Sequence, residues 1–253
     1  VGSPTYSSGN YLNAGSYATT PSNSTHVSGT INVNQTYYNA GTLTVTPKTI
    51  APVNNSTPNK VYDTTTAITN GLLLAVTPLA GDLLSITDTG AYNAKNVGSN
   101  LGYTISNMNL AGHDAANYLL STNSLTGTNG VITPAALTMS GLSANNKVYD
   151  TTTAATISSS GQALVGVFGG DSVSISSTGN LSGVFSQSNV ANGLTVTANG
   201  SSQTTVNGVT MPSAVNVLSG VSLSGTDSGN YYVTGVATPL TANITPAAVT
   251  ITG

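Results

Sequence analysis

Charge and cysteine are the two things this 253-residue sequence has least of: 4% of its residues are charged and none is Cys. Without Cys there are no disulfides, no thiol catalysis and no Cys-ligated zinc. The four basic residues are all Lys and the seven acidic ones are all Asp, so Arg and Glu are missing. Because those two residues are strong helix formers, we expect few helices. The formal net charge of −3 provides no basic surface for phosphates, so we expect no nucleic-acid partner.

Long hydrophobic runs are also missing. No segment approaches the roughly 18 apolar residues that span a membrane, so we expect no membrane insertion. The first residue is Val1 rather than Met, and we expect the sequence to be part of a longer chain. Catalytic side chains are scarce as well, since the two His residues lie far apart at His26 and His113 and no Asp-x-Asp pair occurs. We therefore expect neither an enzyme nor a cofactor.

Strand-forming and turn-forming residues fill the sequence instead. Thr, Ser, Asn and Val dominate, and 28 Gly and 10 Pro interrupt them at short intervals. Polar and apolar residues alternate at 42–45, 194–197 and 249–252, which is the pattern of half-buried strands. The sequence predicts an all-β fold.

An internal repeat organises the chain. The run Asn-Lys-Val-Tyr-Asp-Thr-Thr-Thr-Ala occurs at 59–67 and again, unchanged, at 146–154. Three further motifs recur in the same order: Gly-Asp at 81–82 and 170–171, Leu-x-Gly-x-Asp-x-x-Asn-Tyr at 110–118 and 223–231, and Ile-Thr-Pro-Ala-Ala at 132–136 and 244–248. The chain thus carries two copies of one unit.

The Thr-Pro junctions set the predicted boundaries. Residues 1–46 are expected to end a preceding β repeat, 47–133 and 134–246 to be the first and second repeats, and 247–253 to start the next one. The second repeat is longer because of an insertion near 197–219, whose Asn207-Gly208 pair predicts an additional hairpin.

Repeats of this length, with room for about seven short strands, predict tandem immunoglobulin-like β-sandwiches. A β-solenoid is the alternative, although its coils are usually much shorter than these repeats.

The ordered motifs resemble the YDG and MBG-type repeats of filamentous-haemagglutinin-like adhesins, which Gram-negative bacteria export, commonly by two-partner secretion. The resemblance rests on Asn-Lys-Val-Tyr-Asp at 59–63 and 146–150 together with the three other recurring motifs. It implies an extracellular location at the bacterial cell surface, an immunoglobulin-like repeat array and an adhesive or spacer role. Thr64 and Thr151 depart from it, since the family usually has Gly there.

The Lys-Val-Tyr-Asp motif raises a question of charge burial. On a strand, Lys60 and Tyr62 share one face, so a buried Tyr62 draws Lys60 inward and the ammonium then needs a partner. One interpretation is a Lys–Asp ion pair, and the other is a Lys–Asn isopeptide crosslink promoted by a nearby Asp. The residues considered for either are Lys60, Tyr62, Asp63, Asp82, Asp114 and Asn117, and in the second repeat Lys147, Tyr149, Asp150, Asp171, Asp227 and Asn230. Among them Asp82, Asp114 and Asn117 are the recurrent polar candidates to pair with Lys60.

The segment 227–230, Asp-Ser-Gly-Asn, has a faint likeness to a calcium loop, but its counterpart at 114–117 keeps only the Asp and the Asn. We favour a turn in which Asp114 and Asp227 bond to their own backbone, and we expect no metal.

The leading functional hypothesis is a structural and adhesive module that acts as a stalk and attaches to a host or biofilm carbohydrate or matrix receptor. The insertion is the candidate binding surface, through Asn199, Asn207, Met211 and Asn216. The alternative is self-association, in a filament or between cells, because neutral Thr-rich and Asn-rich edge strands lack the charges that block edge pairing.

Overall fold

The computed structural model describes residues 3–19, 41–54, 56–68 and 74–252. Strands dominate these residues, and the helical elements among them are two short 3-10 helices, η1 (Ala115–Asn117) and η2 (Ser228–Asn230). No helix in the described ranges is long and apolar enough to span a membrane. The prediction of an all-β fold is confirmed.

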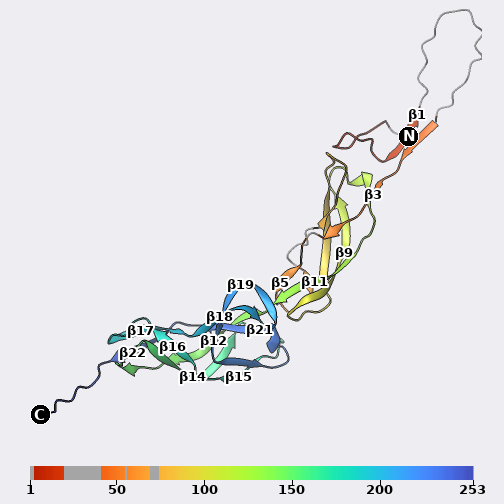
Figure 1. Cartoon of the computed structure of the whole chain (residues 1–253). Coiled ribbons are helices and arrows are strands. Elements are labelled where there is room, and N and C mark those ends of the chain that lie inside the picture. The colour runs from red at the N-terminus through yellow and green to blue at the C-terminus, as the bar shows by residue number, and fades with distance from the viewer. Residues whose placement is uncertain (1–2, 20–40, 55, 69–73, 253) are drawn as a thin grey trace, which may run out of the picture. The chain divides into compact units, whose positions relative to one another are not determined.

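Short and long strands occur in both parts of the chain (Figure 1). Those up to Thr133 are β1 (Gly15–Thr19), β2 (Gly41–Val45), β3 (Lys48–Ile50), β4 (Val53–Asn54), β5 (Asn59–Val61), β6 (Ala67–Ile68), β7 (Leu74–Ala75), β8 (Ser85–Tyr92), β9 (Gly98–Ala111), β10 (Tyr118–Leu120) and β11 (Leu125–Thr133). Those that follow are β12 (Ala135–Ala144), β13 (Lys147–Val148), β14 (Ala154–Val165), β15 (Ser174–Thr178), β16 (Ser182–Phe185), β17 (Ala191–Ala198), β18 (Gly200–Val206), β19 (Val209–Leu218), β20 (Val221–Ser224), β21 (Tyr231–Val236) and β22 (Leu240–Thr245).

The sheets are separate and largely antiparallel. The two largest have the strand orders β5-β11-β9-β8-β6 and β13-β22-β17-β16-β14-β12-β21, and the remaining strands form two-stranded sheets. A β-solenoid would instead stack parallel strands from successive coils. The arrangement is β-sandwich-like, as predicted.

Parallel pairings recur at both ends of each repeat. The first strand after the Thr-Pro junction pairs with the strand that begins at the motif Tyr, so Lys48 lies opposite Tyr118 and Ala135 lies opposite Tyr231. The Lys-Val-Tyr strands pair in the same way with the last strands, β5 with β11 and β13 with β22. These pairings place the recurring motifs at the two ends of each repeat.

The insertion folds as the hairpin that its sequence predicts. Strands β18 and β19 are joined at Asn207 and Gly208, which take φ values of 49° and 78°. Positive φ at both central residues is what a two-residue hairpin turn requires, and Asn-Gly meets that requirement at low cost. Figure 1 shows the hairpin beside β21.

The chain divides by contacts into two compact units that cut through the first repeat. The first unit contains 1–57, 71–90 and 104–126, and the second contains 58–70, 91–103 and 127–253. The repeat boundaries at 47–133 and 134–246 stay a prediction.

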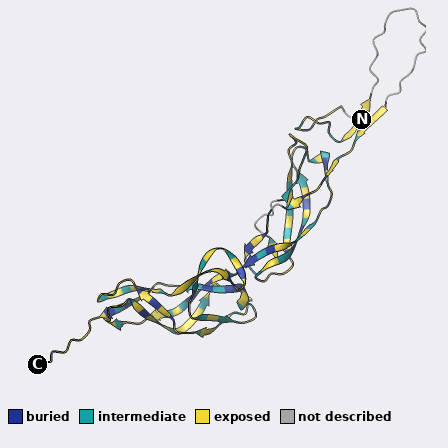
Figure 2. Ribbon diagram, in the orientation of Figure 1, coloured by how far each residue is buried: buried dark blue, intermediate teal, exposed yellow. Residues whose placement is uncertain are grey.

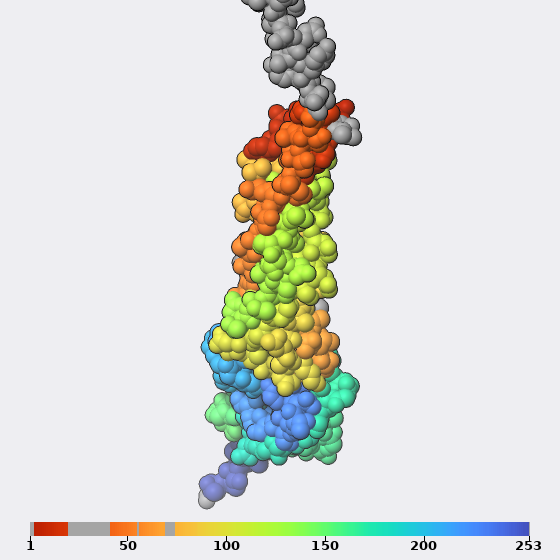
Figure 3. Space-filling view, turned by 90° about the vertical axis from the view of Figure 1, so that its right-hand side faces the viewer, coloured from red at the N-terminus to blue at the C-terminus, as the bar shows by residue number. Residues whose placement is uncertain are grey.

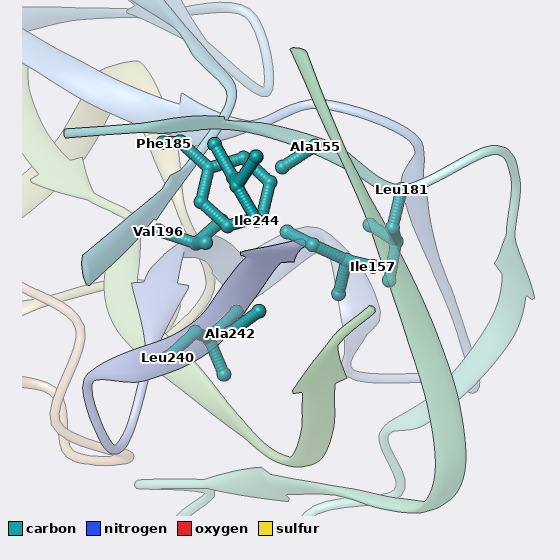
Figure 4. Close-up of a cluster of buried hydrophobic side chains, with 8 residues drawn as sticks. All are labelled: Ala155, Ile157, Leu181, Phe185, Val196, Leu240, Ala242 and Ile244. Atoms are coloured by element: carbon teal, nitrogen blue, oxygen red, sulfur yellow. The ribbon is translucent and has the colours of Figure 1, made fainter. Parts of the chain in front are cut away.

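Strands β14 and β16 of the second repeat each bury one face. Buried and exposed residues alternate along β14 and β16 (Figure 2). The core of the second unit gathers Ala155, Ile157, Leu181, Phe185, Val196, Leu240, Ala242 and Ile244, and Figure 4 shows Phe185, Val196 and Ile244 pointing toward one another. Ile244 ends this core directly ahead of the junction at 245–246.

Candidate functional site

The Lys-Val-Tyr strand of the first repeat has the predicted parity. Lys60 and Tyr62 are buried while Val61 between them is exposed. The Lys60 ammonium lies 5.8 Å from the centre of the Tyr92 ring. Attraction to an aromatic face compensates part of what the charge loses on leaving water.

The partner of the Lys60 ammonium is local. Its Nζ donates to Asp63 Oδ1 at 2.6 Å, to the carbonyl of Thr65 at 2.7 Å and to the carbonyl of Ala67 at 3.0 Å. Burial by itself would raise the pKa of Asp63, but the hydrogen bonds from Lys60 and Thr65 outweigh burial and lower it. The structure therefore shows the Lys–Asp ion pair, between Lys60 and Asp63, that was one interpretation of the motif.

The three recurrent polar residues expected to pair with Lys60 do not carry that role, and on this point the sequence interpretation was wrong. Asp82, Asp114 and Asn117 accept hydrogen bonds from residues of the first unit, as described below. The reason is the tight turn after Tyr62. It places Asp63 and the Thr65 carbonyl directly beside the Lys60 ammonium, which therefore has its partners within the same turn.

The second copy of the motif repeats this geometry. Lys147 Nζ donates to Asp150 Oδ1 at 2.7 Å and to the Thr152 carbonyl at 2.7 Å, and it lies 5.6 Å from the centre of the Phe185 ring. The hydrogen bonds from Lys147 and Thr152 lower the pKa of Asp150 to about 2.

The turn after the motif explains the preference for Gly that the resemblance implies. Thr64 and Thr151 have φ values of 70° and 69°, in the left-handed region. A β-branched side chain is unfavourable there, whereas Gly adopts the region without a steric penalty. Both repeats fold into this turn despite the substituted Thr.

At the opposite end of each repeat a Tyr hydroxyl donates to a buried carboxylate. In the first repeat Tyr118 Oη donates to Asp82 Oδ2 at 2.6 Å and accepts from the Leu79 N–H at 2.9 Å. We call Asp82, Asp114, Asn117 and Tyr118 the first socket.

The second repeat has the same arrangement. Tyr231 Oη donates to Asp171 Oδ2 at 2.6 Å and accepts from the Phe168 N–H at 3.1 Å. We call Asp171, Asp227, Asn230 and Tyr231 the second socket.

The second Asp of each socket holds a neighbouring loop. Asp114 Oδ2 accepts from the Leu83 N–H at 2.8 Å, and Asp227 Oδ2 accepts from the Ser172 N–H at 2.9 Å. The expectation that these carboxylates bond to their own turn was wrong, because neither makes a side-chain cap to its 3-10 helix. In the part of the chain that the structure describes, no three acidic or His side chains gather to hold a metal ion.

The Gly of the Leu-x-Gly-x-Asp motif allows this close approach. Gly112 and Gly225 have φ values of 109° and 110°. A Cβ at either position would collide with the carbonyl of Leu83 or Ser172. The motif therefore needs Gly both for its backbone conformation and for space.

The first socket holds the N-terminal segment of the described chain. Asp82 Oδ1 accepts from the Ser7 hydroxyl and from the Gly9 N–H, the latter at 2.8 Å. Asp114 Oδ1 accepts from the Ser8 N–H at 2.9 Å. Burial would raise the pKa of both carboxyl groups, but these donors outweigh it and lower both pKa values.

Asn117 completes the first socket with a two-way contact. Its Oδ1 accepts from the Ala14 N–H at 2.7 Å, and its Nδ2 donates to Asn13 Oδ1 at 2.7 Å. The side-chain amide thus recognises an Asn and the backbone N–H of the residue after it.

The second socket holds the far end of the first repeat. Tyr62 Oη donates to Asp171 Oδ2 at 2.9 Å, and Lys95 Nζ lies 4.0 Å from Asp171 Oδ1. The Tyr62 ring packs edge-on against Tyr231, with centroids 5.4 Å apart, and against Phe168. One carboxylate therefore receives hydroxyl donors from both repeats.

Asn230 repeats the contact made by Asn117. Its Oδ1 accepts from the Val97 N–H at 2.9 Å, and its Nδ2 donates to Asn96 Oδ1 at 3.3 Å. We call Tyr62, Asn96 and Val97 the base of the first repeat, and the contact between a base and a socket a joint. The Asn-Val pair of the base recurs in the sequence at 189–190, a signal that could have marked it.

Ionisation in this joint is strongly perturbed. Burial and then the hydrogen bond to Asp171 raise the pKa of Tyr62 well above 10, and the same two causes raise the pKa of Tyr231 to about 12. The hydrogen bond from Tyr231 is the main cause that lowers the pKa of Asp171, against burial. The joint is therefore built for a charged Asp171 between two neutral Tyr hydroxyls.

A family model, described as the YDG domain, matches residues 46–125 and 133–211, and no curated protein and no solved structure matches the chain. The chain belongs to the YDG domain family. Both matches begin one residue ahead of a junction Pro, at Pro47 and Pro134. The first match contains the first socket and the base of the first repeat, and the second match contains Asp171 of the second socket.

One group of side chains at the first socket, made by Ser8, His113 and Asp114, has the composition of a catalytic triad but not its geometry. Ser8 Oγ lies 3.3 Å and Asp114 Oδ1 lies 3.0 Å from the same atom, His113 Nδ1. A triad needs the nucleophile and the Asp on different ring nitrogens, so that the imidazole can move a proton between them. These contacts hold the Ser8 segment in the socket. His26, the other His, lies outside the described residues.

The candidate binding residues of the insertion fasten the hairpin to the second YDG repeat. Asn207 Nδ2 donates to the carbonyls of Gly229 and Tyr231, and Asn216 Nδ2 donates to the carbonyl of Thr234. Of the other two candidate residues, Asn199 donates through Nδ2 to Ser182 Oγ, and Met211 is partly buried in β19. Whether this surface binds a ligand stays a prediction.

The joint predicts different responses from two Tyr residues that follow the same sequence motif. Tyr62→Phe removes a hydrogen bond to a buried carboxylate and should lower the unfolding free energy of the second unit by about 1.5–3 kcal/mol. Tyr149→Phe is the matched control, because Tyr149 is 38% exposed, and it should change that free energy by less than about 0.5 kcal/mol. Urea unfolding followed by circular dichroism measures both.

The pH dependence supplies a second readout for the same pair. Between pH 10 and about 12 the folded joint keeps Tyr protons that the unfolded chain releases, so the unfolding free energy should fall as pH rises through this window. Tyr62→Phe should make that fall shallower. Equal slopes in the wild type and in Tyr62→Phe would contradict the joint.

The left-handed turn predicts a stabilising substitution. Thr151→Gly relieves the strain at a φ of 69° and should raise the unfolding free energy by about 0.5–1 kcal/mol, after the extra backbone entropy of Gly is subtracted. Thr151→Ala keeps a Cβ and should give a smaller gain. A loss of stability in Thr151→Gly, measured by thermal unfolding, would disprove strain at this position.

Proposed function

We propose that this chain is a structural and adhesive module of a large secreted bacterial surface adhesin, in which YDG repeats form a stalk and attach the cell to host or biofilm glycans. The joint between the two YDG repeats is the observation that carries the stalk role. Tyr62 is 1% exposed there, and Asp171 receives hydroxyl donors from both repeats. A spacer needs neighbouring repeats held in one register, and a buried, hydrogen-bonded joint does that.

The low charge suits an extracellular module of this kind. Only 4% of the residues are charged, and the ion pairs at Lys60 and Lys147 are formed within a single turn. Exposed charge pairs weaken as salt increases, whereas buried hydrogen bonds are screened much less. Such a stalk keeps its joints over a wide range of ionic strength.

The adhesive half of the proposal rests on a groove beside the hairpin. A cavity of about 330 Å³ lies between the hairpin and the start of β21, with Asn207, Ser228 and Tyr232 among its lining residues. Figure 3 shows the light-blue and blue residues of this region at the surface of the second unit. A Tyr face with nearby amide and hydroxyl groups suits the apolar and polar faces of a sugar ring.

The test measures glycan binding and mechanical resistance on the same chain. We expect the chain to bind members of a glycan array and to lose that binding when 200–218 are replaced by a short Gly-Ser linker. Pulling single molecules from both ends should show a resistance step that Asp171→Ala weakens and the hairpin deletion leaves in place. Absence of glycan binding would contradict the adhesive role, and an unchanged step in Asp171→Ala would contradict the stalk role.

Self-association is the second candidate function, and one observation favours it. Strand β13 forms an edge of the seven-stranded sheet and presents exposed Val148, and the charge of its Lys147 is paired with Asp150. Sedimentation velocity separates the two functions. A sedimentation coefficient that rises with concentration supports self-association, and a constant one supports the stalk.

A further inference from the structure

The second YDG repeat has a base of its own, and no socket contacts it among the residues that the structure describes. Tyr149, Asn189 and Val190 correspond to Tyr62, Asn96 and Val97. The local backbone is the same in both, since the Tyr62 N–H donates to the Thr133 carbonyl and the Tyr149 N–H donates to the Thr245 carbonyl. We call Tyr149, Asn189 and Val190 the second base.

The two bases differ in exposure. Tyr62 is 1% exposed against the second socket, whereas Tyr149 is 38% exposed. Val97 is half-buried and Val190 is exposed. Since the motif and the turn are alike, the difference comes from the socket that covers the first base.

The segment after the second base is exposed in the same way. Residues 247–252 follow Pro246 as 135–140 follow Pro134, so Val249 and Ile251 correspond to Leu137 and Met139. Leu137 and Met139 are 0% exposed in β12, whereas Val249 and Ile251 are 89% and 93% exposed. The segment therefore has the alternation of a first strand without the sheet that buries it (Figure 2).

We propose that the second base and the segment 247–252 together dock the socket end of a further YDG repeat, which is joined to this chain after Gly253 and takes 247–252 as its first strand. The hydroxyl of Tyr149 would donate to the Asp of its Gly-Asp motif. The Asn of the further repeat's Leu-x-Gly-x-Asp-x-x-Asn-Tyr motif would bind Asn189 and the Val190 N–H. The strand that begins at the Tyr of that motif would pair with Ala247.

Two observations select this occupant. The register is the same in both repeats, with Lys48 opposite Tyr118 and Ala135 opposite Tyr231, so a first strand pairs with the Tyr strand of the repeat that it begins. A second copy of this chain fits less well, because its first socket holds Ser7 and Gly9 and its second socket holds Tyr62. The proposed contact between the second base and a further repeat does not depend on whether the chain binds a glycan.

The test extends the chain after Gly253 with a second copy of residues 142–252, so that 247–253 stand in for 135–141. Tyrosine nitration, mapped by peptide mass, reports burial of each Tyr. We expect Tyr149 to be nitrated readily in the original chain and as slowly as Tyr62 in the extended one. Replacing Asp by Ala at the added copy of Asp171 should restore nitration of Tyr149 while the added core stays protected in hydrogen exchange.

The strand assignment has its own matched variant. Val249→Thr combined with Ile251→Thr should leave the stability of the original chain unchanged, because both side chains are exposed there, and should destabilise the added repeat of the extended chain. Tyr149 nitrated equally in both chains, or an added repeat that does not fold on 247–253, would overturn the proposal. So would protection of Tyr149 that grows with the concentration of the original chain, since a second copy would then be the occupant.

Discussion

A buried Asp carboxylate that receives hydroxyl and backbone donors from two different parts of the chain is the interaction on which this structure depends. An ionised carboxylate removed from water is costly unless its lone pairs are filled, and here the donors come from both sides of a joint. Separating the two sides would leave Asp171 or Asp82 under-satisfied in a buried place. The cost of that state holds the repeats together with very few charges.

The same constraint explains why the compact units and the repeats do not coincide. Each unit contains one occupied socket: the first socket holds the segment from Ser7 to Ala14, and the second socket holds the base of the first repeat. Strands β8 and β9 of the first repeat each contribute residues to both units. The compact units are thus organised around the occupied sockets, whereas the repeats are defined by the duplicated sequence.

Sequence reasoning predicted the features that depend on local patterns. Alternation predicted the strands at 42–45 and 194–197, but it was wrong at 249–252, where the structure has no strand. Asn207-Gly208 predicted the hairpin turn, and the parity of Lys60 and Tyr62 predicted their burial. It could not predict the partner of Tyr62, because Asp171 lies more than a hundred residues away and the motifs alone do not show that base and socket face each other. The recurring Gly-Asp and Asn-Tyr motifs marked residues that do contact each other within a repeat, but the contacts that Asp171 and Asn230 make with the other repeat could not be inferred from one repeat alone.

The assignment of Lys60 shows the same limit at short range. A buried ammonium needs a partner, and that much follows from solvation. Asp63 becomes the partner because the chain makes a left-handed turn at Thr64. The sequence does not indicate this turn, because Thr stands where Gly is favoured. Sequence patterns do not predict a tight turn at a residue type that disfavours the turn's conformation.

The most direct measurement of the joint is a double-mutant cycle on Tyr62 and Asp171, using Tyr62→Phe, Asp171→Asn and the double variant. The central claim predicts that the two substitutions are not additive, with a coupling free energy of about 1–3 kcal/mol in the unfolding of the second unit. Additivity within about 0.3 kcal/mol would mean that the hydroxyl and the carboxylate do not depend on each other, and the joint would not be what holds the repeats together.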